Sequence, residues 1–412
     1  RDQPRSRGLG DVYKRQHYYK SWCLIRLGKT AEAQIAIATA EKEPADYCFP
    51  NALEAIKALQ CVVDFAGKAP KALYYLGNLW YDKRRYPTAI AAWERSSRED
   101  ETFPTVWRNL SLAYFNKMNR PDEAVALLEK AFRLDHTDAR VLMELDQLYK
   151  RLNRPHIERL CFLEQHIDIV MTRDDLYLEY VTLLNQTGQY REAIRRIDQR
   201  KFHPWEGGEG KITGQYTICH VELAKIALRE HRYADALALL QATDQYPYNL
   251  GEGKLINAEE NDIWYYKGLA YRGLGDEENA KLWLHKATQG SAEPQQAFFY
   301  NDAQPDKIFY QGLAWRALGE ESKARGRFNK LIKHGEKHLF DHCRIDYFAV
   351  SLPDLAIWED NLDKRNAIHC NYVMGLGYLG LEDRVHAIEY LDKARALDIN
   401  HQGAQIHREL CE

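Results

Sequence analysis

The chain contains 412 residues, of which 57 are Lys or Arg and 60 are Asp or Glu, so its formal net charge is −3. Such a balanced charge gives no reason to expect nucleic acid or an anionic membrane surface as a partner. Hydrophobic residues make up 45% and charged residues 28%, which excludes an intrinsically disordered chain, and no apolar run reaches the ~18 residues that span a bilayer.

The first sixteen residues, RDQPRSRGLGDVYKRQ, have no apolar periodicity. Within them, GLGDVYKRQ resembles the translated read-through of a sequencing adapter at the end of an assembled reading frame. We therefore expect residues 1–16 to be a non-native leader and exclude them from the fold prediction. A targeting signal cannot be judged behind such a leader, so the sequence predicts no compartment.

Two neighbouring segments repeat one pattern. Residues 73–100 and 107–135 each contain two stretches with apolar residues at i, i+3, i+4 and i+7, which predict two amphipathic helices joined by a turn. Small residues such as Gly77 and Ala89 recur where the paired helices must approach closely. The pattern resembles the tetratricopeptide repeat, a helix–turn–helix unit of about 34 residues.

Seven further units align on the small residue of the second helix. Their alignment positions are Ala33, Arg159 in a degenerate unit, Ala193, Ala236, Ala280, Ala324 and Ala387. We therefore predict an all-α fold, a tetratricopeptide-like α-solenoid, in which about nine helix hairpins form a right-handed superhelix over residues 17–412.

The spacing of the units predicts insertions. The alignment positions are 34 or 35 residues apart from Ala89 to Ala193, but 43 or 44 apart from there to Ala324, and the first and last steps are 56 and 63. The extra residues lie between hairpins, near 45–69, 201–215, 244–261, 289–306 and 333–368. Equivalent connections of a solenoid stack along one edge, so we expect these insertions to form one continuous face.

Two of the insertions contain copies of one loop, HPWEGGEGK (203–211) and YPYNLGEGK (246–254). Two interpretations stay open. In one, the loop is a helix-linking turn whose Glu caps the next helix and whose Lys pairs locally. In the other, Glu209 and Glu252 line a polar ligand groove with Trp205, Tyr246 and Tyr248.

The insertions near 289–306 and 333–368 place aromatic residues beside amides and carboxylates, a mixture that suits both sugars and protein interfaces. The candidate ligand-binding residues of all four loops are Trp205, Lys211, Tyr246, Tyr248, Lys254, Tyr300, Asn301, Tyr347 and Trp358. The candidate carboxylates for glycoside chemistry are Glu206, Glu209, Glu252, Asp341 and Asp346. His338, Asp341 and His342 have metal-ligand spacing on a helix, but an exposed polar turn is favoured, so we predict no metal and no cofactor.

The two loop copies, together with IDYFAVSLPDL and HCNYVMGLGYLGL (345–355 and 369–381), resemble one bacterial family. Its members join an N-terminal, β-rich, galactose-mutarotase-like domain of unknown function to a C-terminal tetratricopeptide array. The resemblance covers residues 17–412 and implies a carbohydrate-related role, with the missing β-domain or another protein as partner and a glycan as a further candidate.

From these features we expect an interaction or scaffold solenoid that is the C-terminal fragment of a larger glycan-related protein. The alternative is the helical half of a carbohydrate-active enzyme, whose inserted loops complete a sugar site with the missing β-domain. No Walker, HExxH or GxSxG motif occurs, and we expect no catalysis by this fragment alone.

Overall fold

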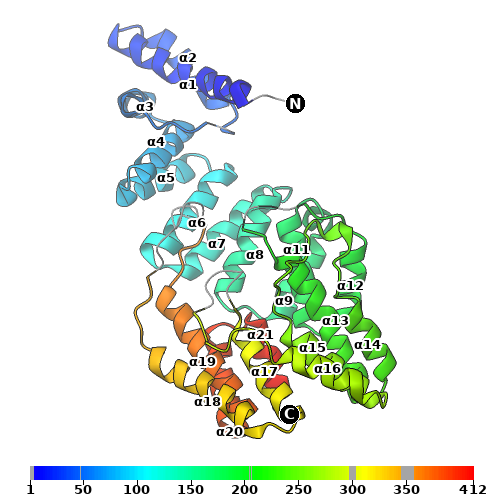
Figure 1. Ribbon diagram of the computed structural model, residues 1–412. Helices are drawn as coiled ribbons and strands as arrows, with labels where there is room; N and C mark the ends of the chain where they lie inside the picture. Colours follow the sequence, from blue (N-terminus) through cyan, green and yellow to red (C-terminus); the bar gives the residue numbers. More distant parts are fainter. Residues whose placement is uncertain (1–3, 47, 204, 206, 297–302, 345–356) are drawn as a thin grey trace. The chain divides into compact units, whose positions relative to one another are not determined.

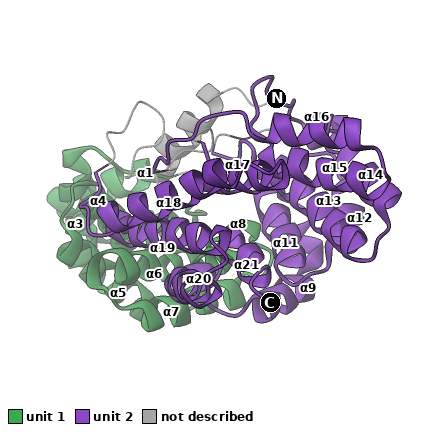
Figure 2. Ribbon diagram, turned by 60° about the horizontal axis from the view of Figure 1, so that its bottom comes forward, with its two compact units in different colours: residues 1–148 green, residues 149–412 purple. Residues whose placement is uncertain are grey.

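The computed structural model describes residues 4–46, 48–203, 205, 207–296, 303–344 and 357–412. Its described residues form 21 α-helices, one 3₁₀ turn and loops, without a β-strand (Figure 1). The predicted all-α fold class is thereby confirmed. The chain divides into two compact units, residues 1–148 and 149–412 (Figure 2). Within the described residues, no helix combines the length and the apolar character needed to cross a bilayer.

Unit 1 consists mainly of helix hairpins. The hairpins are α1 (Pro4–Arg26) with α2 (Thr30–Lys42), α4 (Pro70–Asp82) with α5 (Tyr86–Glu99), and α6 (Pro104–Met118) with α7 (Pro121–Leu134). The helix α3 (Leu53–Ala66) lies within the insertion predicted near residues 45–69. Proline occupies the first turn of α4, α5, α6 and α7, where its missing N–H costs nothing and its fixed φ favours the helix. The helix α8 (Ala139–Arg151) crosses the boundary between the units.

Unit 2 also consists mainly of helix hairpins, and these are more widely spaced along the chain. They are α11 (Asp174–Gln186) with α12 (Tyr190–Asp198), α13 (Lys211–Arg229) with α14 (Tyr233–Gln241), α15 (Asn261–Gly273) with α16 (Glu277–Ala287), α17 (Pro305–Ala317) with α18 (Glu321–His338), and α19 (Leu362–Gly380) with α20 (Arg384–Leu397). The helix α9 (His156–Gln165) precedes them and packs against α11. Three short elements complete the unit: α10 (Ile167–Val170), η1 (Tyr248–Leu250) and α21 (Gln402–Glu409).

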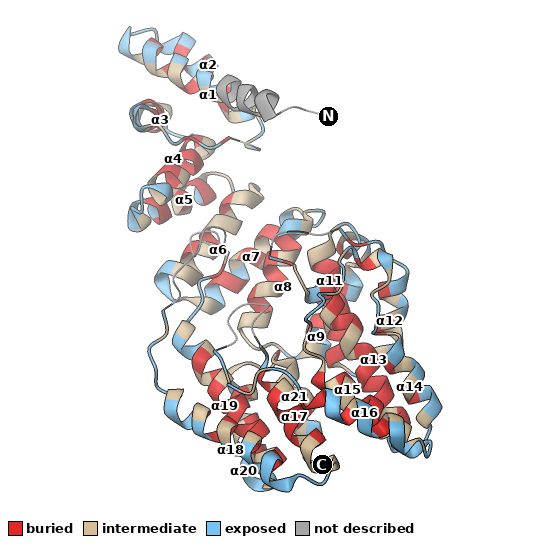
Figure 3. Cartoon of the chain, viewed as in Figure 1, coloured by how far each residue is buried: buried red, intermediate tan, exposed pale blue. Residues whose placement is uncertain are grey.

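The small residues that align the repeats lie at the contacts between paired helices. All eight alanines at these positions are completely buried: Ala33, Ala89, Ala124, Ala193, Ala236, Ala280, Ala324 and Ala387. Gly77 shows why bulk is excluded, because a Cβ there would lie 2.2 Å from Nε1 of Trp93 on the partner helix. Figure 3 shows buried residues on the facing sides of the hairpins. Close helix pairing therefore accounts for the repeat pattern in the sequence.

Arg159 occupies the corresponding position of the degenerate unit and is 1% exposed. Its guanidinium donates to Oδ1 of Asn400 over 2.8 Å and lies 3.2 Å from Oε2 of Glu179. Asn400 lies just before α21, 241 residues further along the chain. The position that departs from the repeat pattern thus holds a long-range contact.

Further hydrogen bonds join the segment 397–405 to the start of unit 2. Asn153 donates to the carbonyl oxygen of Leu397 (3.1 Å), and Gln186 donates to that of Asn400 (2.9 Å). Gln215 donates to Oε1 of Gln402 over 2.7 Å. The series of hairpins in unit 2 therefore closes on itself, with α21 placed against helices from its beginning. We call residues 397–409 the closing segment.

The insertions of unit 2 contact one another in order. We number the insertions of unit 2 from one to four, at 201–215, 244–261, 289–306 and 333–368. Phe202 donates its N–H to the carbonyl oxygen of Asn249 over 2.8 Å, which joins the first insertion to the second. Ser291 of the third insertion donates its N–H to Glu259 of the second over 3.0 Å. Gln295 of the third accepts a hydrogen bond from His369 of α19 over 2.7 Å. These contacts place successive insertions side by side.

Candidate functional site

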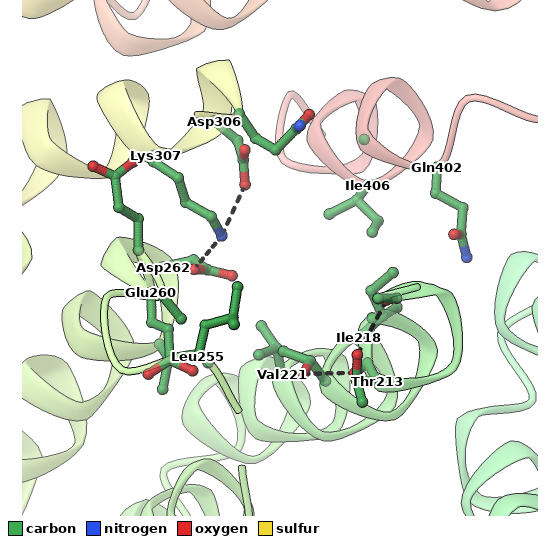
Figure 4. Close-up of a pocket in the computed structure, with 18 of the residues that line it drawn as sticks. Thr213, Ile218, Val221, Leu255, Glu260, Asp262, Asp306, Lys307, Gln402 and Ile406 are labelled. Atoms are coloured by element: carbon green, nitrogen blue, oxygen red, sulfur yellow. Dashed lines mark hydrogen bonds and ion pairs between the residues drawn. The ribbon is translucent and has the colours of Figure 1, made fainter. Parts of the chain in front are cut away.

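A cavity of about 920 Å³ lies within unit 2 (Figure 4). Its walls come from α13, α15, α17, α19 and α21 and from the first two insertions, with Gln304 from the end of the third. The closing segment supplies one wall through His401, Gln402, Gly403, Ile406 and His407. The cavity therefore depends on both the insertions and the closure of unit 2.

Repeat geometry brings polar side chains of successive first helices to this cavity. Asp262 and Asp306 are the second residues of α15 and α17, and both line the wall. Glu222 of α13 and Tyr310 of α17 line it as well, two repeat steps of 44 residues apart. The same helix face recurs in each hairpin, so residues at one repeat step share one surface.

Seven carboxylates line the cavity: Glu209, Glu222, Glu252, Glu259, Glu260, Asp262 and Asp306. Lys307 lies between two of them, with Nζ 2.6 Å from Asp262 and 3.3 Å from Asp306 (Figure 4). Burial by itself lowers the pKa of Lys307, but the two neighbouring carboxylates outweigh it and raise the pKa above its ordinary value. Lys307 is therefore a fixed cation that joins α17 to α15.

Two other wall carboxylates form ion pairs with lysines. Glu222 lies 2.8 Å from Nζ of Lys225, and Glu260 lies 2.5 Å from Nζ of Lys254. Burial raises the pKa of both carboxyl groups, and the lysines offset only part of this rise. These two carboxyl groups are thus buried, which strengthens their interactions with neighbouring charges.

The remaining three wall carboxylates have no cationic partner among the residues that the structure describes. Glu252 accepts a hydrogen bond from the N–H of Gly210 over 2.8 Å, at the N-cap of α13, and Glu259 accepts one from Ser291. Glu209 has no hydrogen-bond partner within the described part of the chain. These three carboxylates leave the cavity negatively charged.

Neutral aromatic and imidazole groups complete the wall. Burial raises the pKa of Tyr310 and Tyr372 well above the usual phenol value, so both carry their proton. Burial also lowers the pKa of His401, and it lowers the pKa of His407 to about 4. Nδ1–H of His407 donates to the carbonyl oxygen of Gly403 over 2.7 Å, which leaves Nε2 as an acceptor.

His407 should make unit 2 sensitive to acid. Its folded pKa of about 4 lies below the ordinary value of 6.5, so the unfolded chain binds the proton more readily. Stability is therefore lost as pH falls from about 6.5 towards 4. Between about pH 7 and pH 5, we expect the wild type to lose about 2 kcal/mol more unfolding free energy than His407→Gln. Urea unfolding at a series of pH values measures this difference, and parallel pH profiles would contradict it.

Four of the residues predicted from the loop copies line the cavity together: Trp205, Glu209, Tyr246 and Glu252. Gly208 allows the indole of Trp205 to lie against the backbone, because a Cβ there would be 2.1 Å from the ring. The contacts of Glu252 and Lys254 are those of a cap and a local ion pair, while Glu209 faces the cavity without such a contact. Glu252 thus lines the cavity and also bonds at the N-terminus of α13, the helix before its own loop, so both interpretations of the loops stay predictions.

Other predicted residues lie away from the cavity wall. Tyr248 is 89% exposed, and Lys211 is exposed at the start of α13. Trp358 is 3% exposed and does not line the cavity. Asp341 is exposed and lies 2.6 Å from Nδ1 of His338. Outside the described residues lie Glu206, Tyr300, Asn301, Asp346 and Tyr347.

Two histidines of the insertion near 333–368 each contact a different carboxylate. His338 pairs with Asp341, and His342 lies 2.9 Å from Asp363. Within the described ranges, no three His, Cys, Asp or Glu side chains come together as metal ligands would. His338, Asp341 and His342 are thus held in two separate pairs.

Several wall residues were not predicted from the sequence. Three of them, Asp262, Asp306 and Glu222, could have been found from the repeat spacing. They lie on the first helices of successive hairpins, and Asp262 and Asp306 are separated by the 44-residue spacing of the aligned alanines. His401 and His407 carried no such signal. They reach the cavity only because the closing segment contacts helices nearly two hundred residues earlier.

A family comparison supports the repeat architecture. The tetratricopeptide-repeat model matches residues 104–138 and 262–289, which correspond to α6 with α7 and to α15 with α16.

The chain also resembles solved structures of tetratricopeptide-repeat (TPR) proteins. YrrB, described as a TPR protein with an unusual peptide-binding site, is 14% identical, with 56% of this chain and 91% of that chain covered and a TM-score of 0.31. A TPR protein from Parabacteroides merdae is 15% identical, with 73% and 98% covered and a TM-score of 0.28. The P58(IPK) TPR domain is 11% identical, with 97% and 78% covered and a TM-score of 0.29. These TM-scores are low, so the conclusion that the chain contains tetratricopeptide repeats rests on its own helix hairpins and on the family match.

Proposed function

We propose that the chain is a protein-interaction scaffold that holds a segment of a partner protein in the cavity of unit 2. The observation that carries this proposal is the composition of the wall. The residues added to the plain repeat, from the first two insertions and the closing segment, converge on one cavity of about 920 Å³. A repeat that served only as a spacer would have no need of these additions.

The cavity wall is suited to a peptide. Its apolar residues include Ile218, Val221, Leu255 and Ile406, and its polar residues provide both donors and acceptors. Binding sites of this kind bury apolar groups and use a few polar groups to fix orientation. A volume of this size accommodates several side chains of an extended segment.

Gly214 allows a direct test, because it lines the cavity on α13 and a Cβ there would meet no atom within 4 Å. Gly214→Leu should therefore fill part of the cavity without disturbing the helix. We expect peptides selected from a random dodecapeptide display library by the wild-type chain to bind Gly214→Leu at least tenfold more weakly, as measured by fluorescence anisotropy.

The matched control is Gly326→Leu, on the exposed side of α18, where a Cβ likewise meets open space. This variant should bind the selected peptides as the wild type does. Equal binding by Gly214→Leu and Gly326→Leu, or a library from which the wild type selects nothing, would contradict the proposal.

A second function is supported by one specific arrangement, the presence of Trp205 and Tyr246 beside Glu209 and Glu252 in the same wall. Aromatic faces next to carboxylates suit a sugar ring. In this proposal the chain is the helical part of a larger bacterial glycan-related protein, and its inserted loops complete a carbohydrate site with a β-rich domain. Calorimetric titration with a panel of neutral oligosaccharides separates the two functions, because sugar binding that Gly214→Leu abolishes would favour the second.

A further inference from the structure

The charges of the cavity define the kind of partner that it accepts. The lining lysine, Lys307, is already engaged by two aspartates, and Lys225 and Lys254 outside the lining pair with Glu222 and Glu260. The imidazoles of the wall are neutral, so they do not offset the remaining negative charge. Glu209, Glu252 and Glu259 thus present three carboxylates that no cation of the described chain neutralises.

These three carboxylates are spread along the row of insertions. Glu209 belongs to the first insertion and Glu252 to the second, where it bonds across to Gly210. Glu259 lies at the far end of the second and bonds to the third. All three are half-buried, so their interactions with a ligand are less screened than those of surface charges. Separated charges of this kind match an extended ligand better than a single small ion.

Two observations independent of the carboxylates also favour a ligand that donates N–H groups. The Nε2 acceptor of His407, whose residue is 3% exposed, has no hydrogen-bond partner within the described part of the chain. The wall also contains Trp205, Tyr246, Tyr310 and Tyr372, and aromatic faces attract ammonium and guanidinium groups. An anionic ligand would meet carboxylates at every level of the cavity.

We propose that the cavity selects an extended basic segment, in which more than one Lys or Arg faces the carboxylates Glu209, Glu252 and Glu259. The proposal rests on the function proposed above and adds the charge class of the partner. The cations of the segment replace the missing partners of the three carboxylates, and its aliphatic stems lie against Val221, Ile218 and the aromatic rings.

The test uses fluorescein-labelled, N-acetylated and C-amidated octapeptides in which Ser alternates with Lys, Gln or Glu. Fluorescence anisotropy with the full chain should give the tightest binding for the Lys peptide, at least tenfold weaker binding for the Gln peptide and none for the Glu peptide. Glu209→Gln and Glu259→Gln should each weaken the Lys peptide about fivefold, and added salt should weaken it further.

The matched control is Glu278→Gln, which removes the same charge from an exposed position of α16 outside the cavity. It should leave the affinity unchanged within about twofold. Equal affinity for the Lys and Gln peptides, or equal weakening by Glu278→Gln and Glu209→Gln, would overturn the proposal.

The failure of this proposal differs from the failure of the proposed function. If library peptides that depend on Gly214 prove to be neutral or acidic, the scaffold function stands and the basic class is wrong. If Lys peptides bind Gly214→Leu as they bind the wild type, the cavity is not their site and the basic class is wrong. Both proposals fail if the selected library peptides also bind Gly214→Leu as they bind the wild type.

Discussion

Replacement of Arg159 by Met is expected to lower the unfolding free energy of unit 2 by about 3 kcal/mol. The guanidinium of Arg159 is fully buried and contacts Asn400 and Glu179. Met has a similar length but provides no donor, so Oδ1 of Asn400 loses the hydrogen bond from Arg159. Loss of a buried donor is costly because its acceptor, here Oδ1 of Asn400, stays desolvated without it.

The loss is expected to be local to the closure. Glu179 keeps Lys150, whose Nζ lies 2.9 Å away, so its charge does not stay unpaired. Asn400, in contrast, makes three of the hydrogen bonds by which the closing segment contacts the start of unit 2. Amide hydrogen exchange in residues 397–409 should therefore increase more than exchange in α15 or α16.

Urea unfolding and hydrogen exchange measured by mass spectrometry check this expectation. Arg191→Met is the matched control, because Arg191 is exposed on α12 in the same unit. It should change the unfolding free energy by no more than about 0.5 kcal/mol. An unchanged stability of Arg159→Met, with wild-type exchange in the closing segment, would show that this buried contact does not hold the closure.

The helix hairpins could be predicted from the sequence because their cause is local. Each paired helix needs a small residue where it meets its partner, so a completely buried alanine recurs in every regular unit. The one irregular position, Arg159, was found as an exception to this pattern. Its partner could not be found, since nothing in the repeat relates residue 159 to residue 400.

The same limit applies to the cavity. The two loop copies repeat in register with the hairpins, so four of their residues could be predicted from the sequence. These residues, Trp205, Glu209, Tyr246 and Glu252, all line the cavity. His401 and His407 depend on the closure, which is a tertiary contact without a periodic signal. A repeat pattern thus predicts which residues of successive hairpins share one surface. It does not predict whether the last hairpin of unit 2 contacts the first.

The closure also couples stability to binding. A ligand in the cavity would contact both the insertions and the closing segment, so it would bind the closed state and stabilise it by mass action. Arg159→Met should accordingly weaken peptide binding even though Arg159 does not line the cavity. A reduction in affinity without any change in the charge preference of the site would distinguish this indirect effect from a direct contact.

Substitution of Gly377 by Ala should destabilise unit 2 by about 2 kcal/mol or more. A Cβ at Gly377 would lie 2.7 Å from the carbonyl oxygen of Phe328 and 2.6 Å from Cγ1 of Ile332, both on α18. On the other helix, a Cβ at Gly335 would lie 2.7 Å from the carbonyl oxygen of Cys370. The helices α18 and α19 therefore approach backbone to backbone, and a methyl group has to push them apart.

Gly326→Ala separates this steric effect from the helix propensity of alanine. Gly326 lies on α18, the helix against which Gly377 of α19 packs, but a Cβ at Gly326 meets no atom within 4 Å. Alanine at this position should stabilise the protein by up to about 1 kcal/mol, because glycine is the weaker helix former. Opposite shifts of the urea midpoint for the two variants are the expected result. A stabilising effect of Gly377→Ala would show that α18 and α19 do not pack at the glycine contact.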